Sequence, residues 1–459
     1  MKLKITYLLL LSGALSSCSD QFTDLSPLSQ RNVDVYYKTE GDLITAVNAT
    51  YKGLQLTGTY NQGYWIANEL RSDNTDAGND IGGGVGPFLN AIDNFNEDAT
   101  TEVIRDVYFD SYVGIARANI VLSRIEPVPI AEITKNRLKG EALFLRSLFY
   151  YNLAVNFGKL PLVLKEISVE EGKNYLQVPA SEVYKQLIAD LILAENYLPV
   201  KYTGLDVGRA TKGAAATLLA KIYLTTGDKT AAIPVLRRII NTYGYTLLTD
   251  YSKLWGIANK NNAESIFEVQ FKGGNFGTGN LFTNAFSPLL RQTSGGYKNR
   301  PTASLEAAFE TNDKRIAASF NPINGPLNPA RFILKYGTTN AFTEFDADYN
   351  FPVFRYSDVY LLLAEALGEG TEAYGLINEV RLKHGGLGNI SAATPGTFED
   401  KLLHERQVEF AFENQRWPDL LRFGKASAVL QAQGKKARLL FLIPQRELDI
   451  NKQFTQNPL

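Results

Sequence analysis

The sequence predicts a mainly α-helical fold, in which stacked helix pairs form a scaffold beside an irregular, loop-rich part. Apolar residues recur at intervals of three and four along much of the chain, which is typical of amphipathic helices. Two long segments, about 58–99 and 244–353, lack this period and are rich in glycine and asparagine. Segments of this length without a helical period are commonly functional loops.

The expected helical scaffold occupies three blocks, about 41–57, 100–243 and 354–459. The period of three and four predicts helices at 40–56, 101–125, 134–157, 181–197, 209–226, 354–368, 370–383 and 398–413. One face of the helix at 134–157 carries Leu138, Ala142, Leu145, Phe149 and Leu153. Between the second and third blocks, residues 265–271 alternate apolar and polar side chains and predict a strand.

Two segments share an order of small, aromatic and turn residues. The first consists of Ala220, Tyr223, Leu224, Gly227, Asp228 and Ala232. The second consists of Ala364, Ala366, Gly370, Ala373 and Ile377. This order resembles the second helix and following turn of a tetratricopeptide unit. Helix pairs of this kind stack because each buries its apolar face against its neighbours, so we expect a tetratricopeptide-like helical-repeat scaffold.

The first eighteen residues predict export and lipidation. Lys2 and Lys4 precede a mostly apolar run over 5–15, which is too short to be a permanent membrane span. The run leads into Leu-Ser-Ser-Cys18, which matches the lipobox of bacterial lipoproteins. We therefore expect a signal peptide at 1–17, acyl chains such as palmitate on Cys18, and a lipid anchor and tether at 18–40. Ser19, where an aspartate would favour inner-membrane retention, leaves the outer membrane as the expected location.

Composition excludes several classes of function. Cys18 is the only cysteine among 459 residues, so no disulfide, zinc–thiolate site or cysteine nucleophile is possible after it. A net charge of −1 gives no electrostatic footprint for nucleic acid. No second long apolar stretch is present, which argues against a membrane-spanning body. The 24 tyrosines and 25 phenylalanines suit stacking on sugars, and they equally suit an aromatic-rich core.

Four motifs follow one another along the chain. The first covers 140–162 and begins Gly-Glu-Ala-Leu-Phe-Leu-Arg-Ser, and the second, Phe-Arg-Tyr-Ser-Asp-Val-Tyr, opens at 354. The third comprises Glu405, Arg406, Glu409, Glu413, Arg416, Asp419, Leu420 and Arg422. The fourth, at 443–458, ends in Gln-Asn-Pro. Together they resemble the SusD/RagB family of outer-membrane nutrient-binding lipoproteins; Asn414 stands where glycine is common, and asparagine also tolerates a left-handed helix end.

The resemblance implies a SusD-like domain over 41–459, with loop-rich ligand-binding regions at about 58–99 and 244–353, that is lipid-anchored in the outer membrane and exposed at the cell surface. Such a protein binds a nutrient, above all a glycan or oligosaccharide, and delivers it to a SusC-like TonB-dependent transporter. It implies capture without catalysis, and no cofactor. Two alternatives stay open: a peptide-binding uptake protein of the same family, and, less favoured, a surface glycoside hydrolase. The starch contacts of the best-known member have no match in this chain, so the ligand is not transferable.

Ligand binding is expected in the aromatic and polar segment 64–95, joined by the glycine-rich segment 273–300. A sugar stacks its apolar ring face on Trp or Tyr, and its hydroxyl groups suit Asn, Asp and Arg. This combination selects Tyr64, Trp65, Arg71, Asp73, Asn74 and Tyr297. The alternative is that Trp65 and its neighbours only pack a loop onto the scaffold. Trp255 stands where the family usually has a buried aromatic residue, so it is not among the candidates.

Catalytic and metal sites are poorly supported. Glu405, Glu409 and Glu413 share one helix face, but the arginines among them indicate ion pairs that hold this helix to its neighbours. His384 and His404 are the only histidines, and neither has a metal-ligand spacing. An EF-hand template beginning at Asp73 fails, because Thr, Ala and Gly occupy its third, fifth and twelfth positions. We expect no metal, although a looser calcium site in this segment stays open.

Overall fold

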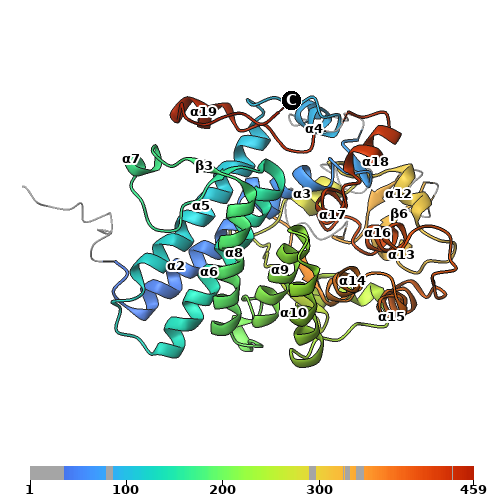
Figure 1. Ribbon diagram of the computed structural model, residues 1–459, viewed down its shortest axis with the longest axis horizontal. Coiled ribbons are helices and arrows are strands. Elements are labelled where there is room, and N and C mark those ends of the chain that lie inside the picture. Colours follow the sequence, from blue (N-terminus) through green and yellow to red (C-terminus); the bar gives the residue numbers. More distant parts are fainter. Residues whose placement is uncertain are drawn as a thin grey trace, which may run out of the picture.

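The computed structural model describes residues 36–78, 86–288, 296–323, 325, 331–337, 346–436 and 438–458. It confirms the mainly α-helical fold with a tetratricopeptide-like scaffold (Figure 1). The predicted signal peptide and Cys18 lie outside the described residues, as does the second half of the open calcium segment. None of the helices in the described part of the chain combines the length and apolar character that crossing a bilayer requires.

Eight helices form a continuous stack. They are α2 (Glu40–Gly53), α5 (Glu102–Arg124), α6 (Glu132–Phe157), α8 (Ala180–Tyr197), α9 (Lys212–Thr225), α10 (Lys229–Thr242), α14 (Tyr356–Leu367) and α15 (Thr371–Val380). Each packs on the next one in this order, and Figure 1 shows them following one another from the left to the lower right. The stack passes directly from α10 to α14, so the long segment between them in the sequence is an insertion beside the scaffold.

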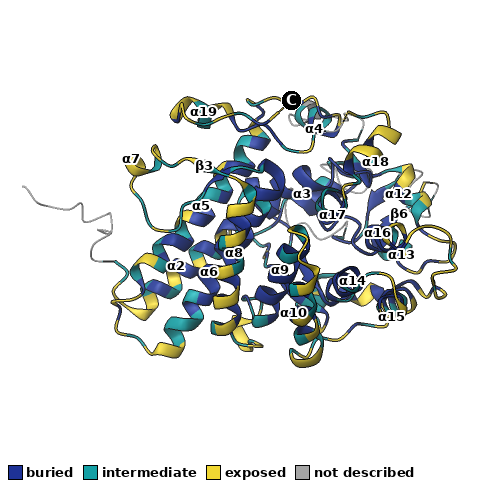
Figure 2. Cartoon of the chain, viewed as in Figure 1, coloured by how far each residue is buried: buried dark blue, intermediate teal, exposed yellow. Residues whose placement is uncertain are grey.

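Local sequence explains where these helices begin and how closely they pack. The side chains of Thr211 and Asp228 accept hydrogen bonds from backbone N–H groups in the first turns of α9 and α10. Gly114 of α5 allows the close approach of α6, because a Cβ there would lie 2.3 Å from the ring of Phe149. The second half of α6 is buried on nearly every side, so this helix forms the centre of the scaffold (Figure 2).

The remaining helices lie outside the stack, and most of them are short. They are α3 (Gly63–Asn68), α4 (Gly86–Asp93), α7 (Val169–Gly172), α11 (Phe282–Phe286), α12 (Ala303–Ala308), α13 (Ile316–Ser319), α16 (Phe398–Glu409), α17 (Arg416–Arg422), α18 (Ala426–Ala432) and α19 (Gln445–Ile450). Of these, α7 and α19 lie near α5, and α12, α13, α16, α17 and α18 lie on the right in Figure 1. Single π- or 3₁₀-type turns are η2 (Thr57–Asn61), η3 (Gly204–Asp206), η4 (Tyr251–Leu254), η5 (Ile257–Asn259) and η6 (Arg381–Gly385). Short helices and strands therefore interrupt both segments that were expected to be loop-rich.

The strands pair as four small antiparallel ladders. The longest joins β4 (Ser265–Val269), the strand predicted from the sequence, to β8 (Phe351–Arg355). The others pair β1 (Thr75–Asp76) with β5 (Arg300–Pro301), β2 (Leu160–Pro161) with β3 (Gln177–Val178), and β6 (Phe320–Asn321) with β7 (Phe332–Ile333). Because β4 leads out of the region after α10 and β8 leads into α14, their pairing ties the inserted segment to the scaffold.

The C-terminal segment closes the structure against the middle of the chain. The backbone N–H of Phe441 donates to the carbonyl of Asn156 at 2.8 Å. The side-chain amide of Asn457 donates to the carbonyls of Phe157 (2.8 Å) and Phe441 (2.7 Å). The end of α6 is thus capped by residues that follow it by as many as 300 positions in the sequence.

Candidate functional site

A cavity of about 490 Å³ lies beside η4 and α13 and is the best candidate for a ligand site. This volume is within the range of about 300–1,000 Å³ that small-molecule sites occupy. The side chains that a ligand would meet are Asp250, Ser252, Trp255, Lys314 and Tyr349, all exposed or partly exposed. We call this the Trp255 cavity. It combines two aromatic rings with hydroxyl and charged groups.

Trp255 presents a fixed aromatic surface to this cavity. Its ring is held by the edge of Tyr251, with ring centroids 5.5 Å apart. The ammonium of Lys335 lies 4.4 Å and the guanidinium of Arg355 lies 5.4 Å from its ring centroid. Both cations also bind Glu413, so they occupy the protein side of the indole. Cations of this kind orient an aromatic ring, and the surface left exposed faces the cavity.

The backbone around Trp255 is pinned as well. The amide of Asn259 donates to the Trp255 carbonyl at 2.6 Å, and the amide of Asn262 donates to the Asn259 carbonyl at 3.0 Å. The ammonium of Lys260 donates to the Phe271 carbonyl (2.8 Å) and to Asp348 (2.7 Å). A site that is held in place before binding loses less conformational entropy when a ligand arrives.

The polar groups at the rim suit a ligand rich in hydroxyls. Asp250 accepts hydrogen bonds from the hydroxyl (2.7 Å) and the backbone N–H (3.0 Å) of Ser252, and these contacts lower the pKa of its carboxyl group. Lys314 supplies the balancing positive charge. Burial raises the pKa of Tyr349, which keeps its phenol protonated and able to donate. One anion, one cation and neutral hydroxyl groups therefore surround the two rings.

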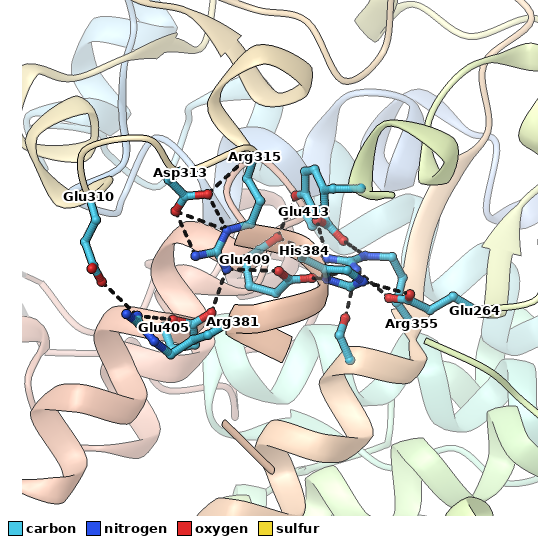
Figure 3. Close-up of polar contacts among 12 residues, drawn as sticks. Glu264, Glu310, Asp313, Arg315, Arg355, Arg381, His384, Glu405, Glu409 and Glu413 are labelled. Atoms are coloured by element: carbon cyan, nitrogen blue, oxygen red, sulfur yellow. Dashed lines mark hydrogen bonds and ion pairs between the residues drawn. The ribbon is translucent and has the colours of Figure 1, made fainter. Parts of the chain in front are cut away.

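A buried ion-pair network centred on Glu409 (Figure 3) adjoins the Trp255 cavity, whose lining includes His384 and Lys335 of this network. Glu409 accepts from Arg315 (3.1 Å), Arg355 (2.9 Å) and Nδ1 of His384 (2.9 Å). Nε2 of His384 bonds Glu264 at 3.1 Å, and Arg355 donates to the same carboxylate at 2.9 Å. These five side chains are no more than 4% exposed.

The network continues on both sides of Glu409, although the expected helix at 398–413 is shorter than predicted: α16 ends at Glu409, so Glu405 shares its helix face and Glu413 follows in the turn after the helix. Glu405 accepts from Arg315 at 2.6 Å and from Arg381 at 3.0 Å. Glu413 accepts from Arg355 at 2.8 Å and from Lys335 at 2.7 Å. The prediction that ion pairs hold this segment to its neighbours is confirmed, and His384 is buried within the same network.

The charges within this network stabilise one another. Burial lowers the pKa of His384, but the charges of Glu409 and Glu264 raise it by more, to about 9. Burial alone would raise the pKa of Glu409; His384 and Arg355 instead hold it well below its usual value. The His384 imidazolium and the carboxylates of Glu264 and Glu409 are therefore ionised at neutral pH.

This cluster has the spacing of a metal site and the chemistry of an ion pair. Ligand atoms of Glu264, His384 and Glu409 lie within 4.8 Å of one another. A metal needs a neutral imidazole, whereas His384 carries protons on both nitrogens when its pKa is near 9. Arg355 also donates to both carboxylates. We assign this cluster a structural role.

Comparisons with known proteins decide the family. Residues 35–224 match a family model described as starch-binding and associating with the outer membrane, and residues 329–440 match the SusD family model. A SusD-like protein of Formosa agariphila is 26% identical, over 99% of this chain and 95% of its own. The starch-binding protein SusD of Bacteroides thetaiotaomicron is 25% identical, over 69% of each chain. A solved laminarin-binding SusD-like protein is 30% identical, covering 92% of this chain and 100% of its own, with a TM-score of 0.82. This chain belongs to the SusD family.

The SusD motifs found in the sequence now have structural meanings. The third motif forms the ion-pair network and its extension, in which Arg406 binds Asp358 (2.8 Å) and Asp419 (2.7 Å). Asn414 has φ of 61°, the left-handed conformation for which glycine is the usual choice. The departure from the SusD pattern at this position is therefore conformationally neutral.

The structure of this SusD protein places five of the six sequence-selected ligand residues in the core. Tyr64, Trp65, Arg71, Asp73 and Asn74 are at most 5% exposed. The Tyr64 hydroxyl shares a hydrogen bond of 2.8 Å with Ser111, and Trp65 packs edge-on against Phe286 at 5.1 Å. The packing alternative describes these contacts, and a role in ligand binding stays a prediction for the five residues.

The two charged members of this group are held by other side chains. Arg71 lies among the rings of Phe95, Trp417 and Phe441, at 5.1, 4.7 and 4.0 Å, and burial lowers its pKa to about 9. Asp73 accepts two hydrogen bonds of 2.7 Å from Arg416.

Tyr297, the sixth residue, is partly exposed and lies 5.5 Å from the guanidinium of Arg300. None of the six lines the Trp255 cavity. Sequence reasoning missed Trp255 because the cavity also needs Lys335 and Tyr349, which come from distant segments of the chain. The asparagines that follow Trp255 at 259, 261 and 262 were the only local signal of a polar surface.

Proposed function

We propose that this SusD-family protein binds an oligosaccharide in the Trp255 cavity and delivers it to a TonB-dependent outer-membrane transporter. The observation that carries the proposal is the pairing of two aromatic rings, Trp255 and Tyr349, with Asp250, Ser252 and Lys314 in one preformed cavity. Stacking surfaces beside hydrogen-bonding groups match the two faces of a sugar. The 30% identical relative binds laminarin, which makes laminarin oligosaccharides the first ligands to test.

The proposed activity is capture without cleavage. Glycoside hydrolysis needs two carboxyl groups on either side of the scissile bond. Among the described residues that line the Trp255 cavity, Asp250 is the only carboxylate. The glutamates of the buried network, at 264, 405, 409 and 413, all form ion pairs and have almost no exposed surface. These contacts favour a binding protein over a hydrolase.

Delivery follows from location and moderate affinity. A lipid on Cys18 would hold the protein at the outer membrane, where a tethered binding site raises the ligand concentration at the mouth of a transporter. A ligand that must be released quickly cannot be held too tightly, because affinity is tuned mainly through the dissociation rate. We expect Cys18→Ser to abolish acyl labelling and to release the protein from membranes; retention of both label and membrane association would contradict the anchor.

Calorimetric titration of residues 19–459 with laminarin oligosaccharides, other glycans and peptides tests the binding step, with product analysis of each mixture. Trp255→Ala should weaken glycan binding by about tenfold or more, and Trp255→Phe should retain part of it because an aromatic face remains. Tyr175→Ala, which removes a partly exposed tyrosine outside the cavity, is the matched control. Trp255 is also the one tryptophan with exposed surface, so a bound sugar should change the intrinsic fluorescence of the wild type and not of Trp255→Phe.

Each result bears on the proposal. Glycan binding with an unchanged ligand, weakened by Trp255→Ala, supports it. Cleaved sugar would overturn capture without catalysis, and binding to peptides alone would replace the ligand class. Full-strength glycan binding by Trp255→Ala would move the site away from this cavity.

A further inference from the structure

A second cavity, of about 400 Å³, lies on the scaffold side of the Trp255 cavity. It is bounded by the connection from α8 to α9, the segment after α10 and the beginning of β4. Three partly exposed tyrosines line it, Tyr202, Tyr243 and Tyr245, and we call it the tyrosine cavity. Its volume again falls within the range of small-molecule sites.

The two cavities adjoin through a small hollow of about 30 Å³. Trp255 and Tyr349 line both this hollow and the Trp255 cavity, while Asn262 and Glu268 line both the hollow and the tyrosine cavity. The hollow has the volume of about one water molecule, so a sugar does not fit within it. A ligand that reaches both cavities must cross the outer surface of the chain between them.

Residues 256–262, which we call the strap, run from one cavity to the other, because Gly256 lines the Trp255 cavity and Asn261 and Asn262 line the tyrosine cavity. Lys260 and Asn262 make the hydrogen bonds described above, and Asn261 exchanges two side-chain hydrogen bonds with Gln270, at 2.8 and 2.9 Å. The outer side of the strap is open, because Ile257 is partly exposed and Ala258 is exposed. Residues 256–262 therefore form a fixed, mostly uncharged bridge from one cavity to the other.

The tyrosine cavity has the same kind of surface as the Trp255 cavity. The Tyr243 hydroxyl is bound by Glu195, and the Tyr245 hydroxyl shares a 3.0 Å hydrogen bond with Thr211, so both rings are held in place. Burial raises the pKa of Tyr202 and Tyr243, so both phenols stay neutral. Lys201 lies exposed at the wall that the tyrosine cavity shares with a further open hollow at the ends of α6 and α8.

We propose that the tyrosine cavity is a second sugar subsite, so that the protein selects an extended oligosaccharide chain that stacks on Trp255, crosses residues 256–262 and ends against Tyr202. This inference rests on the proposed function, since it needs the Trp255 cavity to bind a glycan. It adds a preference for longer oligosaccharides that the Trp255 cavity alone does not give, because each occupied subsite contributes its own contacts to one linked ligand.

Calorimetric titration with a laminarin series from the disaccharide to the octasaccharide tests this inference. In the wild type, affinity should rise with chain length until both cavities are filled. Tyr202→Ala should remove that gain, by about tenfold for the octasaccharide, and leave binding of the disaccharide unchanged. Trp255→Ala should weaken every length. Tyr175→Ala again serves as the matched control, with thermal unfolding of each variant as the check on folding.

Hydrogen exchange of the wild-type protein gives a second measurement that needs no variant. The octasaccharide should slow amide exchange at 200–208 and 243–246, and the disaccharide should not. An affinity that is independent of length, or an equal gain in Tyr202→Ala, would overturn the second subsite while short-chain binding upheld the proposed function. Failure of the wild type to bind any glycan would overturn both.

Discussion

Replacing His384 by glutamine should change how the stability of the protein depends on pH. In the folded protein, burial lowers the pKa of His384 and the charges of Glu409 and Glu264 raise it by more, to about 9. In an unfolded chain the pKa of histidine is about 6.5. The folded state therefore binds this proton more tightly. The resulting stabilisation is complete below about pH 6.5 and is lost as the pH rises to about 9.

The size of the effect follows from the two pKa values. At about 1.4 kcal/mol per pH unit, a rise from about 6.5 to about 9 contributes about 3 kcal/mol to the free energy of unfolding. Glutamine can still hydrogen-bond a carboxylate but does not titrate. The wild type should consequently lose about 3 kcal/mol more than His384→Gln between about pH 6 and 10.

Urea unfolding at a series of pH values measures this difference. Burial lowers the pKa of Lys335 to about 8, so Lys335 titrates in the same window, but it does so in both proteins and cancels in the comparison. His404→Gln is the matched control: the pKa of His404 is lowered, mainly by burial, so its titration affects stability only below about pH 6.5. Parallel stability curves for the wild type and His384→Gln would refute a charged His384 in the folded state.

Two further substitutions test the network and the scaffold through urea unfolding at pH 7. Glu409→Gln removes one negative charge from three buried cations and should lower the free energy of unfolding by about 3–5 kcal/mol. The control Glu372→Gln breaks an exposed ion pair and should lower it by less than about 1 kcal/mol. Equal losses would contradict a stabilising network. Gly114→Ala forces a methyl group against Phe149 and should lower the free energy of unfolding by about 1–3 kcal/mol. The control Gly375→Ala lies in open space on α15 and should raise it by up to about 1 kcal/mol. A stabilising Gly114→Ala would contradict the close approach of α5 and α6.

The scaffold could be predicted because its signals are local. The apolar period of residues 134–157 reports directly which side of a helix is buried, and α6 (Glu132–Phe157) follows it within two residues. The spacing of Glu405, Glu409 and Glu413 likewise predicts a shared helix face, which holds for the first two, while α16 ends before Glu413. Their partners could not be predicted, because Arg315 and Arg355 approach that face from segments far away in the sequence.

The candidate site was harder to predict because exposure is a property of the folded chain. Trp65 lies in a glycine- and asparagine-rich segment whose composition suggests a surface loop, yet α3 buries its ring completely. Trp255 is not among the sequence-selected candidates because the family usually has a buried aromatic residue at this position, yet here it is partly exposed and lines a cavity. Composition distinguishes loops from helices, but it does not show which side of an irregular segment faces the core.

The pairing of Asn457 with the end of α6 has a consequence for the order in which the protein can fold. The ribosome makes α6 long before Asn457, so the carbonyls of Asn156 and Phe157 have no protein partner at the C-terminal segment until synthesis is nearly complete. Contacts between such distant parts of a chain form slowly, because a long loop must close first. The nascent chain must therefore remain incompletely folded until its last residues appear, an interval in which a chaperone or an export machinery can act on it.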